Sequence, residues 1–224
     1  MKRISCCIFD MDGTLTRTND LIFATFNHVG ERYCGRTYSP EEIIAMFGPP
    51  EETAVGRIVP RDRYDEALAD FVGFYSENHQ KMARLHEGIP ELLSYLHRNG
   101  VLLAVFTGKG RTTTLITLDK FGIGKYFDMI VTGSDVRKHK PSGEGISNVV
   151  RAFRLPVEEV LMVGDAVADV QAAHEAGVPV AAVLWDSYGK DRLRAMDLPY
   201  VFHDVGGFFT WIRSRVPETG APAR

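Results

Sequence analysis

The stretch Asp10-Met11-Asp12-Gly13-Thr14-Leu15 (DMDGTL) follows directly on the apolar segment 4–9 (ISCCIF). This apolar segment is short and carries β-branched and aromatic residues, which is typical of a buried strand. Two carboxylates, Asp10 and Asp12, therefore stand where a strand ends and a turn begins. In an open parallel sheet, the loops at the carboxyl ends of the strands meet in one crevice. The junction thus predicts a functional site at the end of the first strand.

Comparable apolar segments recur in the second half of the chain and alternate with segments of helical character. The expected strands are 101–106 (VLLAVF), 129–132 (MIVT), 160–163 (VLMV) and 178–183 (VPVAAV), and the expected helices are 89–98, 111–121, 145–153 and 169–176. Short apolar strands that alternate with helices indicate a parallel sheet with helices on both faces. We therefore predict an α/β protein with a Rossmann-like core.

The segment 16–84 interrupts this alternation. It contains helical candidates at 20–33, 40–46, 52–58 and 63–81, and no convincing buried strand. The simplest interpretation is an all-helical domain, 16–84, inserted into a core that consists of 1–15 and 85–224.

The composition excludes several classes of function. The 224 residues are 45% hydrophobic and 25% charged with a formal net charge of -3, so the chain offers no strong positive field for nucleic acid. No segment approaches the roughly 20 apolar residues of a membrane span. Three cysteines, Cys6, Cys7 and Cys34, cannot form a paired disulfide framework. We expect a cytoplasmic protein that binds neither nucleic acid nor a membrane.

Three further loops bring polar residues to the predicted crevice. They supply a hydroxyl, a lysine and two more carboxylates, which complement the two carboxylates after the first strand. The loops are Thr107-Gly108-Lys109-Gly110 after the second core strand, Lys138-His139-Lys140-Pro141 before the fourth, and Gly164-Asp165-Ala166-Val167-Ala168-Asp169 after the fourth.

This set closely resembles the haloacid dehalogenase superfamily. The four signatures of that family are DxDGT, a Ser or Thr after the second strand, a Lys, and a paired acidic motif such as GDxxxD, and all four occur here in the same order. The resemblance covers nearly the whole chain, because a helical insertion between the first two signatures matches the cap of phosphoglycolate-phosphatase-like and phosphoglucomutase-like members. DMDGTL at a strand end is specific, whereas GDxxxD alone is less so.

The resemblance implies phosphoryl transfer with a carboxylate nucleophile. Asp10 would attack phosphorus to form an aspartyl phosphate, and Asp12 would protonate the leaving group and later take a proton from water. Lys140 would neutralise the nucleophile and the transferring phosphoryl group, while the Thr107 hydroxyl and the Gly108 amide donate hydrogen bonds to that group.

A magnesium ion and backbone amides complete the expected phosphate site. Mg²⁺ would be held by Asp10, the backbone carbonyl of Asp12 and Asp165, because it prefers oxygen ligands. Asp169 would contact the metal through water or orient the groups around Asp165. The backbone amides around Met11 and Asp12 would face the phosphate oxygens.

Substrate choice is expected to lie in the helical insertion. The Gly- and Pro-rich segment 47–52, with Gly48 and Pro49, resembles the cap specificity loop of phosphoglycolate-phosphatase-like relatives, although an ordinary helix connector is an alternative. Arg57 is a candidate for binding an acidic group of the substrate, with a surface salt bridge as the alternative. Lys109 and Arg111 are predicted to be solvated, since a loop lysine and a first-turn arginine usually are.

The leading hypothesis is a magnesium-dependent phosphatase of a small phosphorylated metabolite, with phosphoglycolate as the first candidate. Alternatives are a phosphosugar mutase similar to β-phosphoglucomutase, an inorganic pyrophosphatase-type hydrolase of the same family, and a non-catalytic binding relative. A mutase would return the phosphoryl group to a bound intermediate instead of to water. Monomer and dimer are both compatible with the sequence.

Overall fold

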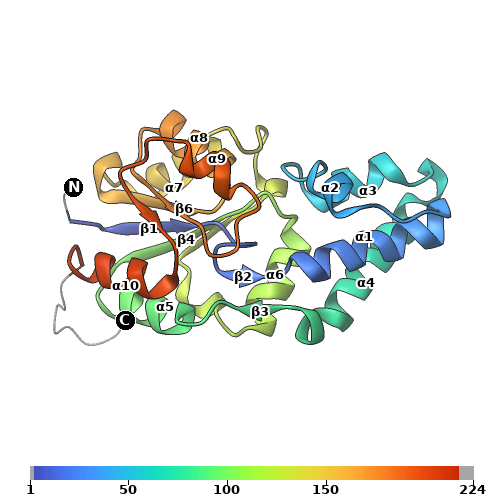
Figure 1. The fold of residues 1–224 in the computed structure, drawn as a ribbon, viewed down its shortest axis with the longest axis horizontal. Coiled ribbons are helices and arrows are strands. Elements are labelled where there is room, and N and C mark those ends of the chain that lie inside the picture. Colours follow the sequence, from blue (N-terminus) through green and yellow to red (C-terminus); the bar gives the residue numbers. More distant parts are fainter. Residues whose placement is uncertain (1–2, 217–224) are drawn as a thin grey trace.

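The core is built around a parallel sheet. The computed structural model describes residues 3–216, and its main sheet has six strands in the order β5-β4-β1-β6-β7-β8, all paired in parallel (Figure 1). The central position of β1 places the DMDGTL loop in the middle of the sheet edge. The strands are β1 Cys6–Phe9, β4 Leu102–Phe106, β5 Met129–Val131, β6 Val160–Gly164, β7 Val180–Val183 and β8 Val201–Phe202.

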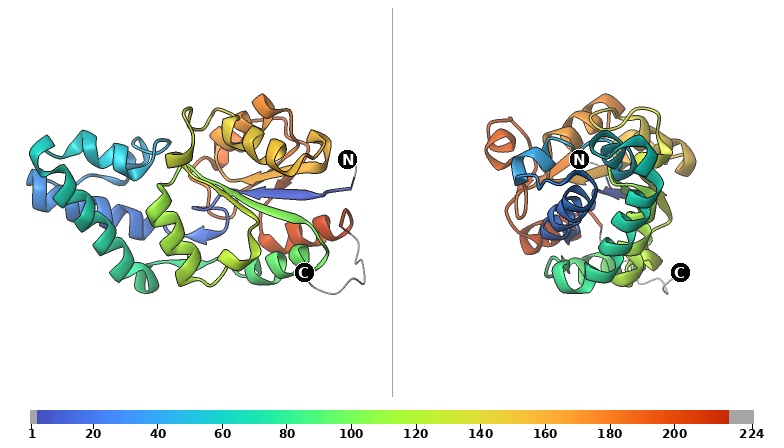
Figure 2. Two further views of the ribbon diagram at one scale, coloured as in Figure 1. Left: turned by 180° about the vertical axis from the view of Figure 1, so that it is seen from behind. Right: turned by 90° about the vertical axis from the view of Figure 1, so that its right-hand side faces the viewer.

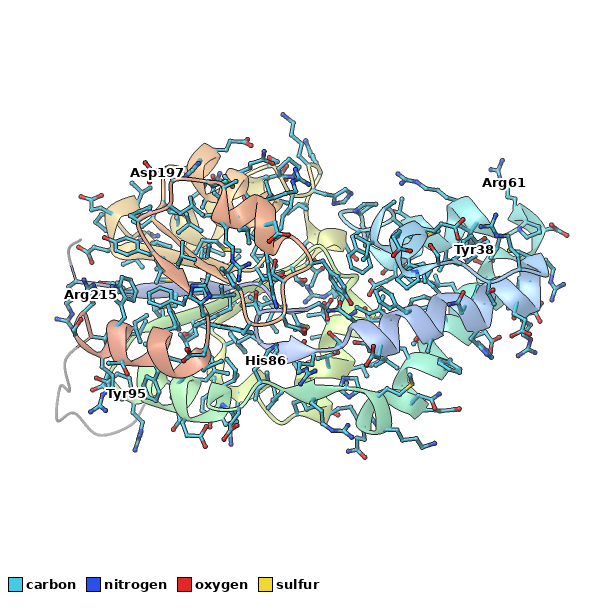
Figure 3. All side chains as sticks on the ribbon, in the orientation of Figure 1. Tyr38, Arg61, His86, Tyr95, Asp197 and Arg215 are labelled. Carbon is cyan, nitrogen blue, oxygen red and sulfur yellow. The ribbon has the colours of Figure 1, made fainter. Side chains whose placement is uncertain are left out.

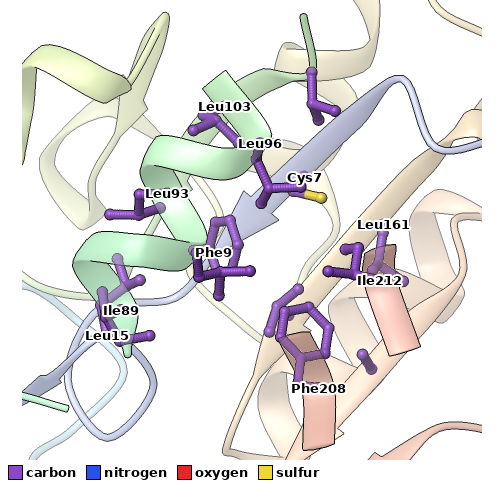
Figure 4. Packing of buried hydrophobic residues seen from close by; sticks show 14 of the residues in the cluster. Cys7, Phe9, Leu15, Ile89, Leu93, Leu96, Leu103, Leu161, Phe208 and Ile212 are labelled. Atoms are coloured by element: carbon purple, nitrogen blue, oxygen red, sulfur yellow. The ribbon is translucent and has the colours of Figure 1, made fainter. Parts of the chain in front are cut away.

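Alternate side chains of β1 enter two separate apolar layers, as a strand buried on both faces requires. Cys7 and Phe9 belong to one layer, and Cys6 and Ile8 to the other. Figure 4 shows the first layer, where Phe208 packs on the same side of the sheet as Phe9. The helices of the first layer are α5 Ile89–Arg98, α6 Arg111–Lys120 and α10 Val205–Arg213; those of the second are α7 Glu144–Phe153, α8 Val167–Ala176 and α9 Lys190–Arg194.

A helical insertion lies beyond the carboxyl ends of the strands (Figures 1 and 2). Its own apolar cluster includes Phe26 and Phe71, whose ring centres are 5.0 Å apart, and it is distinct from both layers of the core. In Figure 3, Tyr38 and Arg61 mark the far part of the insertion, and Arg215 marks the opposite end of the molecule. The helices are α1 Asn19–Cys34, α2 Pro40–Ile44, α3 Glu51–Ile58 and α4 Tyr64–Met82.

A two-stranded antiparallel ribbon joins the insertion to the core. Its strands are β2 Thr16–Arg17 and β3 Arg84–Leu85. The sequence did not predict this ribbon, because strands of two residues are too short to show a period. Four 3-10 turns complete the described elements: η1 Arg61–Arg63, η2 Gly124–Tyr126, η3 Gly133–Asp135 and η4 Val157–Glu159.

The predicted fold class, a Rossmann-like parallel sheet with helices on both faces and a helical insertion, is confirmed. The elements after β7, namely β8, α9 and α10, were not predicted. The division into 1–15 with 85–224 and 16–84 stays a prediction. Within residues 3–216, no helix combines the length and the apolar character that a membrane crossing requires.

Candidate active site

The loop after β1 turns sharply and is fixed by its own backbone. The amides of Leu15 and Thr16 both donate to the Met11 carbonyl, at 2.9 and 3.0 Å. Gly13 has a φ of +85°, and a Cβ atom there would lie 2.5 Å from Oδ2 of Asp165. Only glycine therefore fits this position, both for the backbone angle and for the space beside Asp165.

Lys140 joins two carboxylates from different loops. Its Nζ donates to Oδ1 of Asp10 at 2.8 Å and to Oδ1 of Asp169 at 2.6 Å. The other oxygen of Asp169 accepts from the Ala166 amide at 3.0 Å, which fixes the carboxylate at the start of α8. Burial opposes the charged form of the lysine, but Asp10 and Asp169 together hold the pKa of Lys140 above its ordinary value.

Three carboxylates form a compact acidic cluster. Asp10, Asp165 and Asp169 are all buried and each has an oxygen within 4.8 Å of the others. Thr14 Oγ1 donates to Asp165 Oδ1 at 3.0 Å, and Ser187 Oγ donates to the Asp165 carbonyl. Burial, together with the neighbouring carboxylates, holds the pKa of Asp165 well above its ordinary value.

The cluster fits a divalent cation. Three buried carboxylates face one lysine here, so full ionisation of the cluster would leave negative charge in excess at short range, and hard oxygen donors are the ligands that Mg²⁺ prefers. Because both oxygens of Asp169 are already bonded to protein groups, Asp10 and Asp165 have more capacity left for a metal than Asp169.

Asp12, two residues after Asp10 in the loop that follows β1, has partners of its own. Its Oδ1 accepts from Thr18 Oγ1, and its Oδ2 lies 3.4 Å from Lys109 Nζ. Burial raises the pKa of the Asp12 carboxyl, while Lys109 and Thr18 oppose that rise. The two aspartates of the DxD motif thus have different partners, with Lys140 beside Asp10 and Lys109 beside Asp12.

The loop after β4 carries Thr107 and Gly108. Thr107 is 2% exposed, and its Oγ1 accepts from the amide of Lys109 at 3.3 Å. A Cβ atom on Gly108 would lie 2.9 Å from the carbonyl oxygen of Gly48. The segment between α2 and α3, predicted to be a specificity loop, therefore rests directly on this core loop.

The prediction that Lys109 is solvated is wrong. Its side chain is 1% exposed, and Nζ lies 2.9 Å from Glu51 Oε1 in the insertion in addition to its contact with Asp12. The residue type gave no signal for this, because the burial depends on a partner 58 positions earlier in the chain. Arg111, by contrast, is exposed and pairs with Asp135 at 3.0 Å, as predicted for a surface arginine.

The remaining predicted residues lie in different surroundings. Met11 is fully buried at the turn, and Pro49 stands beside Gly48 in the loop that covers Gly108. Arg57 is exposed on α3. Their assignment to substrate binding stays a prediction.

Sequence reasoning missed several residues that hold the site together. Thr18 and Glu51 contact Asp12 and Lys109, and the indole of Trp185 donates to the Thr14 carbonyl at 3.0 Å. These are hydroxyl, carboxylate and indole groups without a recognisable motif. Only their positions, directly after β2, at the start of α3 and after β7, could have indicated them.

The match to a family model covers residues 7–183 and is described as haloacid dehalogenase-like hydrolase. The chain belongs to the haloacid dehalogenase-like hydrolase family and is a phosphohydrolase.

Relatives with assigned names include pyrophosphatase PpaX from Halalkalibacterium halodurans, which is 35% identical over 202 residues that cover 90% of this chain and 94% of the relative. Pyrophosphatase PpaX from Bacillus velezensis is 34% identical over 205 residues, covering 91% and 94%. Among solved structures, a predicted phosphoglycolate phosphatase from Haemophilus somnus superposes with a TM-score of 0.81 at 22% identity, covering 94% of this chain and 99% of that one. At this identity the structural likeness establishes the fold alone.

Proposed function

We propose that the protein is a magnesium-dependent phosphohydrolase that works through an aspartyl phosphate on Asp10. The observation that carries the proposal is the buried pair of Asp10 and Lys140, 2.8 Å apart at the edge of a three-carboxylate cluster. A carboxylate held by a lysine can remain ionised in a buried site and act as a nucleophile.

The first half of the reaction transfers the phosphoryl group to the protein. A carboxylate oxygen of Asp10 attacks phosphorus, the bond from phosphorus to the leaving oxygen breaks, and Asp12 gives that oxygen a proton. Lys140, the Thr107 hydroxyl and the amides of Gly108 and Met11 balance the negative charge on the phosphoryl oxygens.

The second half restores the carboxylates. Asp12, now ionised, takes a proton from a water molecule, whose oxygen attacks phosphorus and breaks the bond to Asp10. Asp10, the Asp12 carbonyl and Asp165 would hold the Mg²⁺ ion, with Asp169 orienting Lys140 and the start of α8. When bound, the ion supplies positive charge that offsets the repulsion between the carboxylate and the phosphate.

Inorganic pyrophosphate is the substrate to test first, ahead of phosphoglycolate. The curated relatives at 34 to 35% identity are named pyrophosphatases, whereas the solved structures named phosphoglycolate phosphatases are 22% and 19% identical to this chain.

The test measures phosphate release from a panel of pyrophosphate, phosphoglycolate and sugar phosphates in the presence of Mg²⁺. Asp10→Asn should lower turnover by at least about a thousandfold, as the loss of a nucleophile does. Asp62→Asn, an exposed aspartate in the helical insertion, is the matched control and should retain full activity. Equal activity in the wild type and Asp10→Asn would exclude the proposed nucleophile.

The phosphosugar mutase remains the rival, and the same panel separates the two. A mutase needs a bisphosphate primer and releases little phosphate, whereas a hydrolase releases phosphate from one substrate alone. Dependence on the primer with no net phosphate would replace the hydrolase proposal. Lack of turnover under every condition would leave the non-catalytic relative.

A further inference from the structure

Lys109 is a fully buried lysine that no step of the proposed reaction uses. Its Nζ lies 2.9 Å from Glu51 Oε1, 3.4 Å from Asp12 Oδ2 and 4.6 Å from the centre of the Tyr75 ring. A buried ammonium group requires compensating charge, because the loss of its hydration is costly. The compensation comes from two parts of the fold: Asp12 belongs to the core, and Glu51 to the helical insertion.

Glu51 docks on the first turn of a core helix. Its Oε1 accepts from Thr113 Oγ1 at 2.9 Å, and its Oε2 accepts from the amide of Gly110, the residue that precedes α6. Gly110 has no side chain that could cap this helix itself. A carboxylate at a helix N-terminus is favourable because the first amides have no partner within the helix. The insertion therefore caps the amide of Gly110, while Ser134 Oγ of the core accepts from the next amide, that of Arg111, at 3.1 Å.

The backbone of the core leaves room for this contact. A Cβ atom on Gly110 would lie 2.7 Å from Glu51 Oε2 and 2.4 Å from Glu52 Oε2. A side chain at this position would displace the Glu51 and Glu52 carboxylates from the start of α6. Glu52, although adjacent, has a different partner, since its Oε1 accepts from Ser134 Oγ at 3.3 Å.

The contact depends on how the insertion sits on the core. Lys109 and Asp12 both follow core strands, whereas Glu51 and Tyr75 belong to α3 and α4. The chain enters and leaves the insertion only through the ribbon of β2 and β3. Rotation of the insertion about this ribbon would remove Glu51 and Tyr75 from Lys109 but leave Asp12 next to it.

We propose that Glu51 and Lys109 are positioning residues that link docking of the insertion to the placement of Asp12. Glu51 fastens the insertion to Lys109 and the first turn of α6, and Lys109, held between the two carboxylates, fixes Asp12 toward the leaving group. The second half of this inference rests on the proposed function, since it assumes that Asp12 gives its proton to the leaving oxygen. The first half does not.

Hydrogen exchange tests the docking half without any substrate. In Glu51→Gln, the amides at the start of α6 and in the segment 47–50 should exchange at least about fivefold faster than in the wild type. Glu77→Gln is the matched control, because it changes an exposed carboxylate on α4 of the same insertion, and its exchange at α6 should follow the wild type. Unchanged exchange in Glu51→Gln, or an equal increase in both variants, would overturn the docking role.

Leaving-group dependence tests the positioning half. In Lys109→Met, kcat for ethyl phosphate, whose leaving group needs a proton, should fall about 100-fold, but kcat for p-nitrophenyl phosphate should fall less than about fivefold. Lys109→Arg should recover part of the loss, because it keeps the charge. An equal loss on both substrates would show that Lys109 acts on folding or on the phosphoryl group, and would overturn the inference.

The two measurements separate this inference from the proposed function. If the wild type releases phosphate from neither model ester and from no member of the substrate panel, the proposed function fails and so does the role of Lys109 toward a leaving group. Even in that case, faster exchange at α6 in Glu51→Gln but not in the control variant would establish the docking contact. If the wild type is active and the exchange is unchanged, the proposed function stands and the docking inference fails.

Discussion

The Nζ atom of Lys140 lies 2.8 Å from Oδ1 of Asp10, although the two residues are 130 positions apart in the chain. The pair forms because Lys140 lies in the segment between β5 and α7, and the loops that follow β1 and β5 open at the same edge of the parallel sheet. Lys140 is held there by a second carboxylate, Asp169, on the first turn of α8. The cation is therefore shared between the proposed nucleophile and the acidic motif.

Replacement of this lysine should damage both stability and turnover. Lys140→Met leaves two buried carboxylates without their cation, so the free energy of unfolding at neutral pH without Mg²⁺ should fall by about 3 kcal/mol. Activity should fall by at least about 100-fold, because a charge that acts on the phosphoryl group is lost. Urea unfolding and phosphate release measure the two effects. Lys138→Met, a change at an exposed neighbour, should alter neither the free energy of unfolding nor the activity. If Lys140→Met left both quantities unchanged, the assignment would be contradicted.

Gly13→Ala should impair metal activation. The residue has φ +85°, and the new Cβ would meet Oδ2 of Asp165 at 2.5 Å, so the carboxylate must move. The Mg²⁺ concentration that gives half-maximal activity should rise about tenfold or more, since a displaced metal ligand costs affinity. Gly122→Ala is the control, because Gly122 has φ +64° with open space around it. That variant should lose about 1 to 2 kcal/mol of stability from strain alone, with an unchanged Mg²⁺ requirement.

Mg²⁺ should stabilise the protein more at high pH than at low pH. Burial and the neighbouring carboxylates raise the pKa of Asp165, so without metal the folded state retains a proton that the unfolded chain releases. Metal-free stability therefore declines as the pH rises above the ordinary aspartate range. Mg²⁺ bound at Asp165 would displace this proton, so the increase in Tm that it causes should be larger at about pH 8 than at about pH 5.5.

Calorimetry at the two pH values, with and without Mg²⁺, measures this difference. Asp165→Asn should remove most of the increase in Tm, whereas the exposed Asp62→Asn should keep it. An increase that is independent of pH, or that survives in Asp165→Asn, would place the metal elsewhere.

His79 should make the protein less stable in mild acid. It is fully buried on α4, and its Nε2 lies 3.2 Å from Thr117 Oγ1 of the core helix α6. Burial lowers the pKa of His79 from 6.5 to about 4. Between these values the unfolded chain binds a proton that the folded state does not, so the free energy of unfolding falls as the pH drops.

Urea unfolding across this range measures the slope. For one group of this kind the loss should be on the order of 2 kcal/mol between pH 6.5 and 4. His79→Gln removes the titrating ring and should flatten the slope, even if it lowers stability at every pH. Parallel curves for the wild type and the variant would assign the acid sensitivity to other groups.

The difference between Lys140 and Lys109 shows which side-chain environments the sequence can predict and which it cannot. Lys140 stands in a recognisable signature, and the structure brings it to Asp10. Lys109 stands next to a signature, and its type and position favour a solvated side chain. It is buried only because Glu51 and Tyr75 of the helical insertion cover it, and no local pattern in the sequence predicts which face of the insertion meets the core.

The strands show the same contrast between what the sequence predicts and what only the fold decides. The strands β1, β4, β6 and β7 were predictable because each is an apolar run buried on both faces. The ribbon of β2 and β3 has two residues per strand, and it exists because the chain must enter and leave the insertion at adjacent points. That requirement comes from the connectivity of the fold, and the local amino-acid composition does not reveal it.

The sequence by itself determined the α/β class, the helical insertion and the loops that carry Asp10, Asp12, Thr107, Lys140 and Asp165. Apolar periodicity and turn residues are local properties, so they can be read along one chain. Only the tertiary structure decided that Lys140 joins Asp10 to Asp169, that Lys109 joins Asp12 to Glu51, and that Gly13 must remain glycine beside Asp165. These relationships depend on which loops meet in space. Burial makes the charged groups interact strongly only after the chain has folded.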